Sequence, residues 1–194
     1  YGRTAQKASI FSQFGLAKKC VAAYQRAVEL EPGNVDFRLS LFEYYRQAPG
    51  LVGGGMDKAA AEAAVIKKID AFLGRIVFAT LYLAEKKYDR ALAEFDEVLQ
   101  SSPDDYASLY QVGKVAAVSG QFLDRGLASL RRCLDLPPPA TPNTPGHVAA
   151  QWRLGMILEK KSDPAGARAA YEAAVNLDPN FTPAAEALSK LTGR

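Results

Sequence analysis

Apolar residues recur along this chain at intervals of three and four positions, the spacing that places them on one face of an α-helix. A motif of a small residue, a large apolar residue, another small or medium residue and a proline repeats with steps of four, three and five positions. Its four clear copies are Cys20, Tyr24, Ala27, Pro32; Ala91, Phe95, Val98, Pro103; Gly126, Leu130, Cys133, Pro138; and Ala167, Tyr171, Ala174, Pro179. The long gap after Pro32 accommodates one more copy, which begins at Ala59 and has lost its proline. We therefore expect five helical repeats and no sheet.

A second helix-period pattern precedes each copy, with large apolar residues around a residue that is usually small. In order, these are Lys7-Ala8 with Phe11, Leu41-Phe42 with Tyr45, Phe78-Ala79 with Tyr82, Val112-Gly113 with Ala116, and Leu154-Gly155 with Leu158. Turn signals lie between the two patterns, at Gly15, Lys86-Lys87, Gly120 and Ser162-Asp163-Pro164. Each repeat is therefore predicted to be a helical hairpin.

This arrangement resembles the tetratricopeptide repeat, and the resemblance extends over nearly the whole chain. The fifth repeat matches best, from Leu154-Gly155 through Ala167 and Tyr171 to Pro179. The resemblance implies an all-α fold, a right-handed α-solenoid of about five hairpins with a C-terminal capping helix. We expect one domain over 1–194, with repeats at about 1–34, 35–71, 72–105, 106–147 and 148–181. The capping helix is expected at 183–192, with Thr182 as its N-cap.

A glycine-rich segment at 49–56 interrupts the second repeat. It does not match a phosphate-binding loop, because Lys58 is followed by Ala59 rather than Ser or Thr and the flanking pattern is helical. We expect an elongated structural turn with Asp57 as the N-cap of the next helix; contact with an anion is the alternative. Similar turns occur in bacterial tetratricopeptide proteins, which favours a bacterial source.

Composition and charge exclude several classes of function. Hydrophobic residues make up 48% of the chain and the net charge is only +3, so we expect a soluble protein that does not bind nucleic acid. No apolar run approaches the roughly 20 residues that a membrane span requires. Cys20 and Cys133 fall in core positions and are expected to be buried, unpaired thiols, while His147, the only histidine, is expected in an exposed loop. No catalytic set, metal site or cofactor is indicated, and we expect no enzyme.

The resemblance implies binding in a concave groove lined by the first helix of each hairpin. The predicted groove residues are Gln6, Ser9, Ser40, Glu43, Arg46, Thr80, Tyr110, Gln111, Lys114, Trp152, Arg153 and Met156. Tyr110, Trp152 and Arg153 are of the types enriched at binding hot spots. Packing of Trp152 inside the protein, in place of the family's usual tryptophan one position earlier, is an equally good interpretation.

We therefore expect a protein-interaction scaffold that binds a peptide or helix of a partner whose identity the sequence does not indicate. Two alternatives stay open: an accessory protein of the cell envelope that binds a small ligand in the groove, and a regulatory segment of a longer enzyme. The first repeat is weakly capped, which is compatible with a homodimer through the N-terminal end. The composition suits the bacterial cytoplasm and the periplasm equally.

Overall fold

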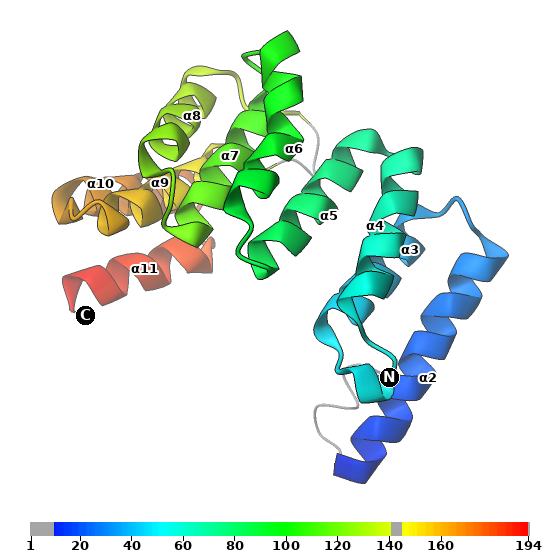
Figure 1. Cartoon of the computed structure of the whole chain (residues 1–194). Coiled ribbons are helices and arrows are strands. Elements are labelled where there is room, and N and C mark those ends of the chain that lie inside the picture. Colours follow the sequence, from blue (N-terminus) through cyan, green and yellow to red (C-terminus); the bar gives the residue numbers. More distant parts are fainter. Residues whose placement is uncertain (1–9, 141–144, 194) are drawn as a thin grey trace. The chain divides into compact units, whose positions relative to one another are not determined.

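The computed structural model describes residues 10–140 and 145–193, with side chains from Phe14 onwards. These residues form ten α-helices and one short 3₁₀ turn, and they contain no strand (Figure 1). The prediction of an all-α fold is therefore confirmed. The chain divides into two compact units, residues 1–81 and 82–194. A single domain over 1–194 stays a prediction.

The first unit contains α2 (Ile10–Leu30), α3 (Val35–Gln47), the 3₁₀ turn η1 (Gly50–Val52), α4 (Met56–Ile69) and most of α5 (Ala71–Ala84). Helix α3 packs between α2 and α4. Ala59 and Ala63 of α4 are fully buried, and their small side chains let α3 approach closely with Phe42 and Tyr45. Outside this core, Arg38 of α3 forms an ion pair with Glu62 of α4 at 2.9 Å.

The turn predicted at Gly15 is absent, because α2 continues from Ile10 through Gly15 to Leu30. A glycine inside a helix costs only about 1 kcal/mol relative to alanine, and the residues that follow it are mostly good helix formers. No proline lies in this stretch to stop the helix. The first repeat therefore differs from the hairpin that its sequence predicts.

The glycine-rich segment is a structural turn, as predicted. Gly53 has a φ of +95°, and a Cβ on Gly54 would lie 1.8 Å from the carbonyl oxygen of Ala48, so both positions require glycine. The hydroxyl of Tyr44 lies 2.7 Å from the carbonyl oxygen of Val52 and holds the turn against α3. The prediction for Asp57 is wrong: α4 begins at Met56 with Gly55 as its N-cap, which places Asp57 in the first turn of the helix.

The second unit contains α6 (Tyr88–Ser101), α7 (Tyr106–Ser119), α8 (Leu123–Asp135), α9 (His147–Lys160), α10 (Pro164–Leu177) and α11 (Thr182–Thr192). Helix α7 contacts α6, α8 and α9, and α10 packs between α9 and α11. The small positions of the repeat explain the close packing, since Leu130 lies directly against Gly113 and the ring of Tyr171 against Gly155. The pairs α7 with α8 and α9 with α10 pack as the predicted fourth and fifth hairpins.

Polar side chains fix several helix starts in both units. Asn34, Asp105 and Asp163 accept hydrogen bonds from backbone N–H groups in the first turns of α3, α7 and α10. At the capping helix, α11 begins one residue earlier than predicted. Phe181 is its N-cap, and Thr182 is therefore the first helical residue rather than the cap.

Candidate functional site

The predicted groove residues of the first unit are already satisfied by partners within α3. The Ser40 hydroxyl donates to the backbone oxygen of Asp36 at 2.9 Å. The Glu43 carboxylate accepts from Arg46 at 2.6 Å and from Gln47 at 2.7 Å. Gln6 and Ser9 lie outside the described residues. Thr80 of α5 also donates its hydroxyl proton inside its own helix, to the oxygen of Ile76 at 2.9 Å.

The predicted residues of α7 lie mostly in the core. Tyr110 is 5% exposed and Gln111 is 8% exposed, because α7 is covered by α6, α8 and α9 together. Little of either side chain is exposed in this structure, and their role in binding stays a prediction. Lys114, on the same helix, is half-buried.

The predicted residues of α9 come together as one cluster. The Arg153 guanidinium stacks on the Trp152 ring, with its carbon 4.0 Å from the ring centroid. One of its terminal nitrogens, Nη1, lies 3.4 Å from the sulfur of Met156. The Nε–H of Arg153 is buried and has no hydrogen-bond partner among the residues that the structure describes. Within the described residues, no carboxylate pairs with this arginine.

Trp152 is partly packed inside the protein and partly exposed, so it agrees with both interpretations of its sequence position. Its ring meets Phe181 edge to face, with centroids 5.6 Å apart at an interplanar angle of 74°, so part of it is packed inside the protein. The side chain is nevertheless only half-buried. The remaining surface of the indole lines a hollow between α9, α10 and α11.

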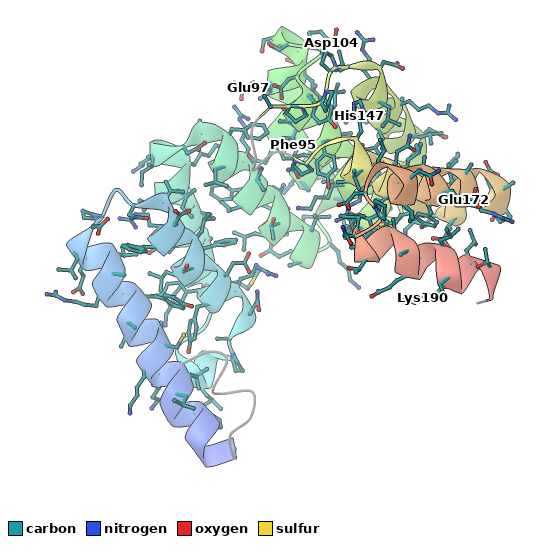
Figure 2. The ribbon with its side chains drawn as sticks, turned by 180° about the vertical axis from the view of Figure 1, so that it is seen from behind. Phe95, Glu97, Asp104, His147, Glu172 and Lys190 are labelled. Carbon is teal, nitrogen blue, oxygen red and sulfur yellow. The ribbon has the colours of Figure 1, made fainter. Side chains whose placement is uncertain are left out.

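This hollow, which we call the C-terminal hollow, has a volume of about 420 Å³. Trp152, Met156, Pro183 and Ala187 provide its apolar lining. The remaining lining residues are Glu159, Tyr171, Thr182, Glu186 and Lys190, the last labelled on α11 in Figure 2. The hollow thus combines an apolar wall with charged groups of both signs, the composition of a site that orients a side chain as well as burying it.

One acid of the hollow is already engaged by a buried tyrosine. The Tyr171 hydroxyl donates a hydrogen bond to the Glu159 carboxylate. Burial, and secondarily this hydrogen bond, raise the pKa of Tyr171 above its ordinary value. The interaction anchors Glu159 at the edge of the hollow, and both Glu159 and Glu186 of α11 are exposed.

The contribution of α11 to this site is absent from the sequence prediction. One face of α11 packs inward, where Ala184 is fully buried. A second face carries Pro183, Glu186, Ala187 and Lys190; the last three lie three, four and seven positions after Pro183, which is helical spacing. That spacing is the signal that could have placed them beside Trp152.

The remaining candidates for chemistry are structural. Cys133 is fully buried as predicted, whereas Cys20 is only half-buried, contrary to the prediction. His147 is not in an exposed loop: it is the first residue of α9, it stacks on Tyr106, and its Nε2 lies 2.9 Å from the backbone oxygen of Leu136. Figure 2 labels it at the start of α9.

The described part of the chain offers neither a group of metal ligands nor a membrane-spanning helix. There, no three His, Cys, Asp or Glu side chains are grouped so that they could hold a metal ion. No helix of the same residues is both long and apolar enough to cross a bilayer.

Comparison with known proteins identifies the repeat. The family model of the tetratricopeptide repeat matches residues 76–140 and 115–180, and a second model of the same description matches residues 5–34. No curated protein sequence matches this chain.

Solved structures share the fold at low sequence identity. A tetratricopeptide repeat protein of Parabacteroides merdae is 17% identical with a TM-score of 0.67, and the match covers 98% of this chain and 70% of that one. A thermophilic tetratricopeptide repeat protein of Thermus thermophilus is 16% identical with a TM-score of 0.67, over 99% of this chain and 97% of that one. YrrB, described as having an unusual peptide-binding site, is 17% identical with a TM-score of 0.53, over 92% of this chain and 86% of its own.

Proposed function

This chain belongs to the tetratricopeptide repeat family, and from that premise we propose that it is a non-enzymatic interaction module. The C-terminal hollow and the adjacent Arg153 bind a peptide or helical segment of a partner protein. The family fold and the peptide-binding site named for YrrB support a role in protein interaction.

The stacking of Arg153 on Trp152 is the observation that carries this proposal. An arginine that lies flat on an indole is held in place, so it loses little conformational entropy when it binds a ligand. Its Nε–H is buried, so a carboxylate or carbonyl oxygen of a partner would bind the terminal nitrogens of the same guanidinium. Guanidinium and carboxylate groups also match in geometry and form two parallel hydrogen bonds.

The hollow beside this arginine suits an apolar side chain of the same partner. Trp152 provides a rigid aromatic wall, and Met156 can adjust its shape to different side chains. The partner segment therefore combines a large apolar residue with a nearby carboxylate or a free backbone carbonyl. Binding of this kind requires no cofactor.

Peptide selection followed by calorimetry tests the proposal. Peptides selected from a displayed random library are titrated into the wild-type protein, Arg153→Glu and the control Arg131→Glu, which makes the same charge change at an exposed position of α8. We expect Arg153→Glu to weaken binding by about tenfold or more, since a hydrogen bond to a charged group contributes about 1.5–3 kcal/mol. The control should bind like the wild type.

Equal affinity of Arg153→Glu and wild type would contradict the proposal. A library that yields no binding peptide, together with thermal stabilisation by a small metabolite, would favour the alternative of a small-ligand protein.

A further inference from the structure

A second hollow, which we call the N-terminal hollow, lies between α2 and α3 in the first unit. Its volume is about 580 Å³. Helix α2 contributes Ala17, Cys20 and Tyr24 to its lining, and α3 contributes Leu39, Tyr44 and Ala48 among others. Its walls are mostly apolar, and an exposed apolar surface of this kind often marks an interaction site.

The fourth repeat, in the second unit, has both of its helices, and it shows which helix covers the surface that corresponds to the N-terminal hollow. The repeat register places Cys20 and Tyr24 at the positions that Gly126 and Leu130 hold on α8. Both α8 positions are covered by α7: a Cβ on Gly126 would lie 2.2 Å from the Cβ of Ala116, and Leu130 is in direct contact with Gly113.

Burial differs accordingly between the two units. Leu130 is fully buried, whereas Cys20 and Tyr24 are only half-buried. The N-terminal hollow therefore occupies the place that α7, the first helix of its hairpin, takes in the fourth repeat.

The chain contains a sequence that fits this place. The family model matches residues 5–34 as a tetratricopeptide repeat, which includes a first helix as well as a second. In the register of the fourth repeat, Ala8 corresponds to Gly113 and Phe11 to Ala116. Residues 1–14 carry Arg3 and Lys7 and no acidic residue, while Glu43 is the only charged side chain in the lining of the hollow. The lining therefore carries no positive charge that would repel this basic segment.

The same copy of the chain cannot place residues 10–14 in this hollow while α2 is continuous from Ile10. Helix α2 continues through Gly15 to Ile10, and the six residues before Leu16 extend it by about 9 Å along its axis, away from the residues that line the hollow. Folding back would require a break at Gly15.

We propose that the N-terminal hollow binds residues 5–14 of a second copy of this chain, and that the exchange is reciprocal. Each copy completes the first repeat of the other with the contacts that α7 makes in the fourth repeat. Such an exchange of an identical element is a low-cost route to a dimer, because the contacts are those of the fold itself. Gly15 is the residue at which the exchanged and self-contained forms diverge.

Disulfide trapping tests the exchange directly. In the register of the fourth repeat, position 11 faces position 20, so we would oxidise Phe11→Cys in a Cys133→Ala background and analyse the product by non-reducing electrophoresis and mass spectrometry. We expect a covalent dimer joined between the introduced thiol and Cys20 of the second copy. Within one straight helix, nine residues span about 13.5 Å, too far for a disulfide.

The other outcomes overturn the proposal. A bridge within one chain would show a hairpin that closes on itself, and the absence of any bridge would show that residues 5–14 lie elsewhere. If the covalent dimer still forms after Cys20→Ala is added, the disulfide must join the two introduced cysteines at position 11. That result would also contradict the exchange.

The unmodified protein provides a second measurement that does not depend on a variant that folds. Light scattering after gel filtration should give twice the monomer mass of 20.9 kDa. Gly15→Pro, which breaks α2 where the two forms diverge, should shift the mass to that of the monomer while circular dichroism stays helical. A wild-type protein that is monomeric at every concentration tested would refute the proposal.

Discussion

At the scale of one residue, the close packing of α9 against α10 requires a glycine at position 155. A Cβ at this position of α9 would lie 2.4 Å from the ring of Tyr171 on α10. Tyr171 is fully buried and cannot move aside, so Gly155→Ala should lower the free energy of unfolding by about 1–3 kcal/mol. Urea unfolding followed by circular dichroism measures the change.

Gly15 is the matched control, because it also lies inside a helix but a Cβ added to it would meet no atom within 4 Å. Gly15→Ala should raise the free energy of unfolding by up to about 1 kcal/mol. The same sign for both variants would contradict this account of the packing.

The buried thiol of Cys133 should make the protein less stable at alkaline pH. Burial, together with the nearby charge of Asp105, raises the pKa of its thiol to about 12. The fold therefore favours the protonated thiol, and this contribution is complete below the pKa of an unfolded cysteine, about 8.5. It is lost as the pH rises from there towards 12.

Between pH 7 and about pH 10.5, the free energy of unfolding should thus fall more for the wild type than for Cys133→Ala, in which this thiol is absent. Equal decreases would show that the Cys133 thiol does not contribute.

At the scale of helices, burial decides which ion pairs contribute to stability. Arg38 and Glu62 join α3 to α4, and their side chains are only 12% and 16% exposed. Glu62→Gln removes the charge that compensates Arg38 and should cost about 1–3 kcal/mol. Glu172→Gln on α10, in the exposed pair with Arg168, should change stability by at most about 0.5 kcal/mol. Similar effects of both substitutions in urea unfolding would contradict this distinction.

The helices that the sequence predicts well are those whose pattern is local. Small residues at Ala91, Gly126 and Ala167 and the prolines that follow them mark the second helix of each hairpin, because close packing and helix termination depend on the residue itself. The turn predicted at Gly15 is wrong because a glycine by itself does not determine the local structure. A glycine permits a turn without requiring one, and the good helix formers around it favour continuation.

The binding residues were harder to predict than the helices that carry them. Tyr110 and Gln111 fall on a face that the repeat register assigns to the groove, yet α7 has neighbours on nearly every side and both are buried. Trp152, Arg153 and Met156 do come together, since residues three and four positions apart meet on one helix face. What surrounds them depends on α11, whose docking is a property of the tertiary structure.

At the scale of the whole molecule, fold and function are supported by different observations. Solved structures with 16–17% sequence identity share the fold, because the repeat conserves the sizes of packed residues rather than their identities. The surface of α9 and α11 is not part of that packing requirement. Under the proposed function, partner recognition would therefore depend on this chain's own residues, foremost Trp152 and Arg153.

Trp152 is the only tryptophan of the chain, so its fluorescence reports on the C-terminal hollow alone. The most direct test of the proposed function is to titrate a selected peptide while following this emission. We predict a saturable change in emission, with the same dissociation constant as calorimetry gives, and a shift to higher concentration in Arg153→Glu. Peptide binding that calorimetry detects but that leaves the emission of Trp152 unchanged would place the binding site elsewhere and contradict the account.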